Sequence, residues 1–227
     1  MEPDERQEMA DLLKPTHTAL LVIDYQNDFV SEGGALHRAG LHTPGLAAIA
    51  PDLRGLMDAA RAAQVMVVLI RCHYDREQYL SASFLWQARR RFRGLYVDIP
   101  VCESGTWGAA FVPGFEPQER DVVVTKHRFS AFAGTDLDQV LRNRGVTTLV
   151  VGGVVTHVCV ESTVRDAAFL DYRCVIPRET TAGWQPQWHE TSLQVMDWGF
   201  GRVVRRQDVL DSWPGTASHL QVKEVHI

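Results

Sequence analysis

Three polar side chains of the 227-residue chain each follow a strongly apolar stretch: Asp24, Lys126 and Cys159. A thiol becomes a strong nucleophile when it loses its proton, and a nearby ammonium group stabilises the thiolate that results. A carboxylate is the simplest group that accepts this proton and later returns it. These three residue types could therefore attack a carbonyl carbon together, provided that the fold brings them to one place.

Cys159 lies where a predicted strand passes into a predicted helix. Thr148 to Val151 is a β-branched, apolar run typical of a strand buried on both faces, and Gly152-Gly153 ends its regular pairing. From Val160 onward the apolar residues recur at helical spacing. Unpaired backbone N–H groups at a helix N-terminus favour a thiolate over a thiol, so Cys159 is a candidate nucleophile. The alternative is a buried cysteine that packs as a small hydrophobe, which also describes Cys72, Cys102 and Cys174.

Asp24 and Lys126 also stand at the ends of predicted strands. Asp24 follows the apolar run of residues 18–23, and Lys126 follows residues 121–125. In parallel α/β sheets the ligand crevice lies beyond the carboxyl ends of the strands, so we expect both side chains at the edge where Cys159 begins its helix. Alone, Asp24 could cap a turn and Lys126 could be a solvated surface lysine. The presence of three such residues at one edge of the sheet favours a shared catalytic role over these separate ones.

The elements that must position these residues alternate along the chain. Helical patterns cover residues 46–63, 80–92, 136–143, 160–172 and 189–198, while strand patterns cover residues 18–23, 65–70, 121–125, 148–151, 173–177 and 202–205. This alternation predicts an α/β fold, a three-layer α/β/α sandwich with a six-stranded, mainly parallel sheet. Residues 76–120 are expected to supply a surface helix, a pocket lid or a subunit contact.

Composition narrows the functional classes. The formal net charge of -5 argues against a nucleic-acid binder, which should present a basic face to phosphate. No apolar run approaches the roughly 20 residues that span a bilayer, and the first residues lack the order of a signal peptide. We expect one cytoplasmic domain over residues 1–227, with residues 1–15 as an N-terminal extension and residues 213–227 as a C-terminal tail. The four widely spaced cysteines are expected to be reduced thiols.

Three motifs resemble the isochorismatase-like cysteine hydrolases over residues 16–212. LLVIDYQNDF is similar to the family's first strand with its aspartate, VVTKHRFSAFAGTDLD to its lysine block, and VVGGVVTHVCVESTVRDAAFLDY to its nucleophile block. The nucleophile and lysine blocks look most like those of the ureidoacrylate, biuret and N-carbamoylsarcosine amidohydrolases. The resemblance implies a Rossmann-like sandwich and hydrolysis of a C–N bond in a small linear amide, ureide or carbamoyl compound.

The same resemblance implies roles for single residues. Asp24, Lys126 and Cys159 would form the catalytic triad, and the peptide bond between Val154 and Val155 would be cis. The backbone N–H groups of Val155 and Cys159 would form an oxyanion hole. Family members usually assemble as homo-oligomers, so a dimer or tetramer is expected. No cofactor is expected, and no metal, because CHYDREQYLSASF does not reproduce the Asp-x-His zinc pattern of the nicotinamidase branch.

Substrate contacts are predicted from residues beside the triad in the sequence. The candidates are Tyr25, Gln26, Phe29, Phe129 and His157, while Phe132 and Trp184 could equally be core aromatics. His157 stands where relatives commonly carry Asp or Asn, and Val155 replaces a smaller Ala or Thr.

Two other functions stay open from the sequence. One is a vinyl-ether hydrolase acting on an isochorismate-type acid, which would need basic pocket residues, with Arg128 as the obvious candidate near the triad. The other is a catalytically silent assembly or interaction module, against which the presence of all three triad residues argues.

Overall fold

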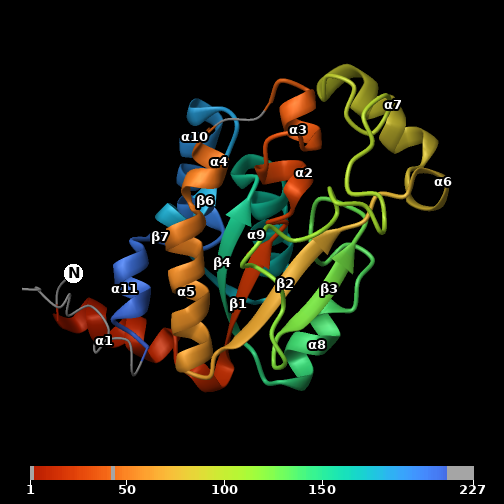
Figure 1. Ribbon diagram of the computed structural model, residues 1–227. Coiled ribbons are helices and arrows are strands. Elements are labelled where there is room, and N and C mark those ends of the chain that lie inside the picture. The colour runs from red at the N-terminus through yellow and green to blue at the C-terminus, as the bar shows by residue number, and fades with distance from the viewer. Residues whose placement is uncertain (1–2, 42–43, 214–227) are drawn as a thin grey trace, which may run out of the picture.

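A parallel β-sheet forms the centre of the protein, as the sequence predicts. The computed structural model describes residues 3–41 and 44–213. Within these ranges the strand order is β3-β2-β1-β4-β5-β7, with the short β6 paired to β4 (Figure 1). The strands are β1 Thr18–Ile23, β2 Met66–Cys72, β3 Val122–Lys126, β4 Thr148–Val154, β5 Arg173–Pro177, β6 Thr181–Ala182 and β7 Arg202–Val204. Each of the six predicted strands is present within a few residues of its expected bounds, and β6 is an addition.

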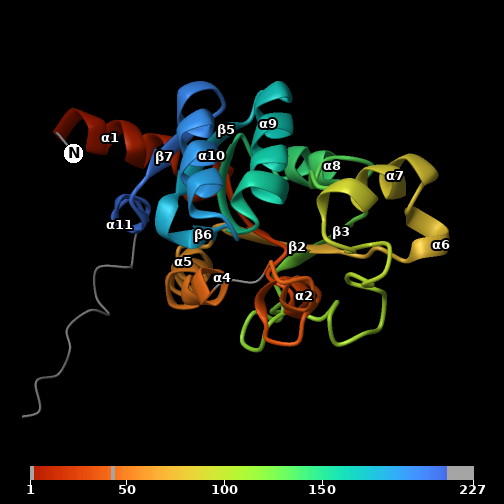
Figure 2. The ribbon, with the colours of Figure 1, turned by 90° about the horizontal axis from the view of Figure 1, so that it is seen from above.

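Helices cover both faces of this sheet, which completes the predicted three-layer sandwich. Figure 2 shows α4 and α5 on one face and α8, α9 and α10 on the other. The helices are α1 Pro3–Leu12, α2 Asn27–Val30, α3 Ala35–Arg38, α4 Pro44–Ala48, α5 Ala50–Ala62, α6 Arg76–Tyr79, α7 Ala82–Arg91, α8 Leu137–Asn143, α9 Glu161–Phe169, α10 Pro186–Gly199 and α11 Arg206–Leu210. Short 3-10 turns cover Pro15–His17 and Arg178–Thr180.

The single helix expected over residues 46–63 is two helices, α4 and α5. Pro51 lies in the first turn of α5. Because proline has no N–H group, it cannot donate a hydrogen bond to the preceding turn, and it is best tolerated where a helix starts. The helix is therefore interrupted at Ile49.

The apolar strand runs follow from burial on both faces. All six residues of β1 are buried. Leu20 and Val22 belong to the cluster beneath α5, whereas Leu21 and Ile23 belong to the cluster beneath α8, α9 and α10. A strand between two helical layers needs apolar side chains at every position, which is why these runs do not alternate.

Both ends of the described chain pack on this core. Met9 and Leu13 of the expected N-terminal extension are buried in the cluster beneath α5. Trp213 is buried too, and its indole N–H donates to the Leu13 carbonyl oxygen at 3.1 Å. The rest of the expected C-terminal tail, residues 214–227, lies outside the described residues. No helix in the described ranges is both long enough and apolar enough to cross a membrane.

Gly153 permits the close approach of β1 and β4 beside the site. It pairs with Ile23 in the parallel register and has a φ of 115°. A Cβ atom at this position would overlap the Ile23 carbonyl oxygen. Glycine is therefore required both by its backbone conformation and by the space available.

We expect Gly153→Ala to lower the free energy of unfolding by about 3 kcal/mol or more, because strained backbone and overpacking each cost roughly 1–3 kcal/mol. Gly145→Ala is the matched control, since Gly145 has a φ of 67° and an added Cβ atom there would meet no other atom within 4 Å. This control should cost roughly 1–2 kcal/mol. Urea denaturation of both variants measures the difference, and equal losses would contradict the steric argument.

Candidate active site

Asp24, Lys126 and Cys159 converge at the edge of the sheet where the carboxyl ends of β1, β3 and β4 lie. Asp24 follows β1, Lys126 is the last residue of β3, and Cys159 follows β4. Asp24 and Lys126 are fully buried, and Cys159 is 6% exposed. Strand order explains the meeting, since β2 alone separates β3 from β1, and β4 pairs with β1 directly.

Lys126 makes three short polar contacts. Its Nζ atom lies 2.7 Å from Asp24 Oδ2 and donates to Cys72 Sγ and the Arg128 carbonyl oxygen, each at 3.0 Å. An ammonium group has three N–H donors, so each has an acceptor. Burial alone would lower the pKa of Lys126, but attraction to Asp24, and then to Cys159, outweighs it and raises this pKa well above its ordinary value. Lys126 therefore stays charged at neutral pH.

Asp24 keeps one carboxylate oxygen available. Its backbone has a φ of 50°, and its N–H donates to the Ile70 carbonyl oxygen at 3.0 Å. While Oδ2 faces Lys126, Oδ1 is buried with no hydrogen-bond partner in the described parts of the chain. A buried, unpartnered carboxylate oxygen is costly, and a proton donor that reaches it is bound strongly.

Cys159 sits in a π-helical turn rather than at the first turn of an α-helix. This turn covers Thr156–Val160, and α9 follows at once. The Val160 N–H donates to the Val155 carbonyl oxygen at 3.3 Å, five residues back. The Thr163 hydroxyl donates to the Cys159 carbonyl oxygen at 2.7 Å and accepts from the Ala131 N–H at 3.0 Å. Thr163 thus ties the cysteine to the segment after β3.

The Val154–Val155 peptide bond is cis, at the position that the sequence analysis names. Both residues line the same cavity as Asp24 and Cys159. Within the ranges that the structure describes, the Val155 backbone N–H donates no hydrogen bond. It is therefore available to a ligand.

The cavity beside Cys159 is small and largely apolar. Its volume is about 20 Å³, which is room for roughly one water molecule. Asp24, Cys159 and Val155 form its polar end, and the other side chains that line it are Phe29, Leu36, Phe92, Leu95, Tyr96, Phe129, Val154, Val158 and Trp184. A substrate must therefore displace side chains at the cavity mouth, where Phe92, Phe129 and Trp184 are half-buried.

Tyr25 and Gln26, two expected substrate contacts, lie outside the cavity lining. The Tyr25 hydroxyl donates to the Leu46 carbonyl oxygen at 3.3 Å. The Gln26 amide donates to the Cys72 and Ala109 carbonyl oxygens at 3.1 and 2.7 Å, and it accepts from the Cys72 N–H at 2.7 Å. Both side chains thus form hydrogen bonds with neighbouring segments of the chain, and Gln26 fixes the end of β2.

Phe29 and Phe129 line the cavity, whereas His157 packs behind it. The His157 ring lies edge-on to Trp184, at 4.7 Å, and to Trp188, at 5.3 Å. Burial, then the nearby His189, lowers the pKa of His157 to about 4, so its ring is neutral at pH 7. Of the two undecided aromatics, Trp184 lines the cavity and Phe132 stacks on Tyr172.

Cys72 is a site residue that the sequence analysis assigned to the core. It is fully buried beside Lys126 in the β2–β3 register. Burial, followed by a hydrogen bond with the Cys159 side chain, raises the pKa of Cys72 well above its ordinary value. Its thiol therefore stays protonated and can donate to Cys159. Cys72 is the last residue of β2, at the same edge of the sheet as Asp24, and this position at a strand end is the sequence signal that could have identified it as a site residue.

His73 and Asp75, which follow β2, both contact Ser104. The Ser104 hydroxyl lies 3.1 Å from His73 Nδ1 and donates to Asp75 Oδ2 at 2.6 Å. In residues 3–41 and 44–213, no group of three or more His, Cys, Asp or Glu side chains is arranged to hold a metal ion. The expected lack of a metal stays a prediction.

Comparisons with known proteins agree on one family. The isochorismatase domain matches residues 18–208. The ureidoacrylate amidohydrolase RutB of Agrobacterium fabrum is 36% identical over 177 residues, 74% of this chain and 77% of that protein. A cysteine hydrolase from Pseudomonas syringae superposes with a TM-score of 0.75 at 29% identity, covering 88% of this chain and 94% of the other. N-carbamoylsarcosine amidase from Thermoplasma acidophilum superposes with a TM-score of 0.67 at 25% identity, covering 84% of this chain and 96% of the other.

We expect Lys126→Met to cost roughly 3–5 kcal/mol of unfolding free energy, because it leaves the buried Asp24 without its ion-pair partner. The matched control is Lys14→Met, which breaks an exposed pair with Asp11 and should leave the free energy of unfolding nearly unchanged. Urea denaturation at pH 7 measures both changes. A Lys126 variant as stable as its control would contradict the buried ion pair.

Cys72→Ala should slow alkylation of Cys159 by iodoacetamide at pH 7 by roughly 10-fold, because a hydrogen bond to a charged group contributes about 1.5–3 kcal/mol. Cys72→Ser keeps a donor and should restore most of the rate. Mass spectrometry of the labelled peptide assigns the modification to Cys159. Unchanged rates in both variants would remove Cys72 from the site.

Proposed function

The chain belongs to the isochorismatase family, and from that premise we propose that it is a cysteine-dependent amidohydrolase. Its substrate would be a small linear amide, ureide or carbamoyl compound, cleaved at a C–N bond through a thioester intermediate. The observation that carries the proposal is the unpartnered Asp24 Oδ1, which shares a cavity with Cys159 while Lys126 holds the other oxygen.

The first step is activation of the thiol. Asp24 accepts the proton of Cys159, and the thiolate attacks the carbonyl carbon of the substrate. Lys126 stabilises negative charge at the site, and the Cys72 thiol donates to the thiolate. The support for these roles is the 2.7 Å contact of Lys126 with Asp24 and the 3.0 Å contact with Cys72.

The attack makes a tetrahedral intermediate with a negatively charged oxygen. The backbone N–H groups of Val155 and Cys159 donate to this oxyanion. The availability of the Val155 N–H and its place in the cavity lining support this assignment.

Collapse of the intermediate breaks the C–N bond. Asp24 returns its proton to the leaving nitrogen, ammonia departs from a primary amide, and the acyl group stays on Cys159 as a thioester. Asp24 then takes a proton from water, which attacks the thioester carbonyl and releases the acid, while the proton returns to the Cys159 thiolate. One water is consumed for each amide cleaved.

Ammonia release from a panel of small amides and ureides tests this function. The panel comprises ureidoacrylate, biuret, N-carbamoylsarcosine, nicotinamide and aliphatic amides. We expect release from at least one compound and a loss of roughly 10⁴-fold or more in kcat for Cys159→Ala, since removal of a covalent nucleophile leaves only binding and oxyanion contributions. Cys174→Ala, at a buried thiol outside the site, is the matched control. Circular dichroism checks the fold, and full activity of a folded Cys159→Ala protein would refute the mechanism.

A further inference from the structure

Among the described residues, the walls of the cavity at Cys159 carry no positive charge. Aromatic rings of Phe29, Phe92, Tyr96, Phe129 and Trp184 form much of the wall. In the parts of the chain that the structure describes, no Lys, Arg or His side chain lines it. Burial raises the pKa of Tyr96 well above its ordinary value, so its phenol is also neutral at pH 7. Apart from Asp24 and Cys159, a ligand here meets apolar surface and the neutral Tyr96 phenol.

The Lys126 ammonium group already has a partner for each of its N–H groups. Lys126 lies behind the reaction centre, and its three N–H groups face Asp24, Cys72 and the Arg128 carbonyl oxygen. It is fully buried and is not part of the cavity lining. A second anion would have to displace one of these partners.

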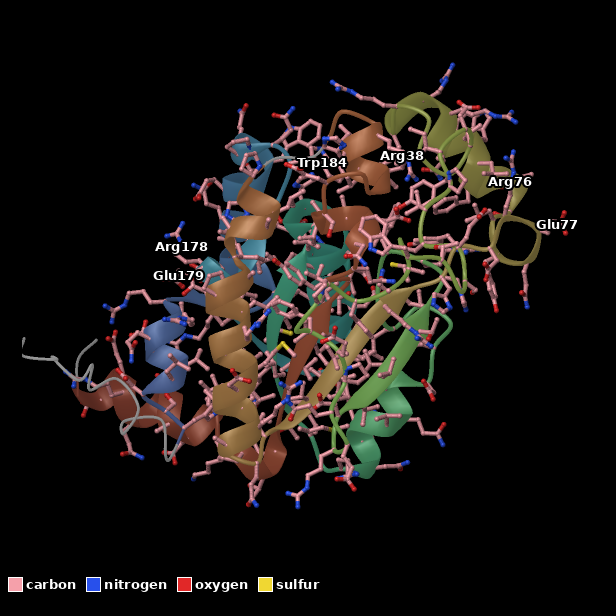
Figure 3. All side chains as sticks on the ribbon, viewed as in Figure 1. Arg38, Arg76, Glu77, Arg178, Glu179 and Trp184 are labelled. Carbon is pink, nitrogen blue, oxygen red and sulfur yellow. The ribbon has the colours of Figure 1, made fainter. Side chains whose placement is uncertain are left out.

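Two arginines of the described chain, Arg128 and Arg38, bind backbone carbonyl groups of other segments. Arg128 donates to the carbonyl oxygens of Tyr79 and His127, and its guanidinium lies 5.7 Å from the Phe84 ring centroid. Arg38 donates to the Gly33 and Pro100 carbonyl oxygens. Figure 3 shows Arg76 and Glu77 at an outer corner of the molecule, far from Trp184.

The reaction centre has no net positive charge that could hold a carboxylate. Asp24 and Lys126 neutralise each other, and transfer of the Cys159 proton to Asp24 leaves this sum unchanged, because the thiolate charge replaces the carboxylate charge. A substrate carboxylate would therefore lose its hydration against aromatic walls without a cationic partner.

We propose that this site selects neutral substrates, in which the scissile amide or ureide is attached to an apolar group, and rejects carboxylated ones. The inference rests on the amidohydrolase function proposed above and narrows its substrate class. The apolar group displaces the half-buried rings of Phe92, Phe129 and Trp184 and packs against them. The carbonyl group then lies between Cys159 and the Val155 N–H.

Matched pairs of substrates that differ in one charge test this selectivity. The ureide pair is 3-ureidoacrylate and its methyl ester, and the amide pair is adipic acid monoamide and hexanamide. We expect kcat/KM for ammonia release to be about 100-fold or more higher for the neutral member of each pair, because an unpaired charge is not accepted in a desolvated site.

A charge-reversal variant tests whether the wall sets this preference. Phe92→Arg places a cation at the half-buried cavity mouth, and Phe92→Leu removes the ring without adding charge. Phe92→Arg should raise the carboxylate-to-neutral ratio of kcat/KM by about 10-fold or more relative to wild type. Phe92→Leu should leave this ratio within about 3-fold of wild type.

The outcomes separate the two proposals. If the wild-type protein cleaves the carboxylated member as well as the neutral one, or better, the selectivity is refuted and the amidohydrolase function stands. If the wild-type protein cleaves none of these four compounds and no compound of the wider panel, both the amidohydrolase function and the selectivity are refuted. A neutral preference unchanged by Phe92→Arg would refute the role of the wall.

Discussion

A buried ion pair between Asp24 and Lys126 is the constraint on which the site depends. Two charges removed from water are tolerated only when each is close to its partner and the remaining polar atoms are satisfied. Lys126 meets this condition through Asp24, Cys72 and the Arg128 carbonyl oxygen. Asp24 meets it only in part, because Oδ1 has no partner among the described residues. This unpartnered oxygen is the atom of the ion pair that can accept a proton.

The parallel sheet supplies the geometry for this pair. Ends of adjacent parallel strands lie at one edge, so residues distant in sequence meet there without long loops to support them. Gly153 lets β4 approach β1 closely, and the π-helical turn after it carries Cys159 to the cavity. Gln26 holds the end of β2 and with it Cys72. The reaction centre is thus built on rigid elements, as precise placement of reacting groups requires.

The proposed selectivity would depend on a different part of the chain. Phe92, Leu95 and Tyr96 follow α7, in a stretch with little regular secondary structure, and they close the cavity over the strand ends. Relatives named as ureidoacrylate amidohydrolases share the family with this chain. A reaction centre on strand ends with part of its wall on a loop allows one chemistry to serve substrates of different polarity when the loop differs.

The sequence by itself determined the layers, the six main strands and the three polar residues at or beyond the ends of three of them, because burial on both faces leaves a continuous apolar run that stops at the edge of the sheet. It did not determine which neighbours of the triad face the cavity. Tyr25 and Gln26 directly follow Asp24, yet their side chains bind other segments. Cys72 read as a small hydrophobe, yet it accepts a hydrogen bond from Lys126. Periodicity indicates whether a side chain is buried, whereas its partner is decided only when distant segments pack together. Phe29, Phe129 and Trp184 could be named from the sequence, but the roles of Cys72, Phe92 and Tyr96 follow only from the tertiary structure.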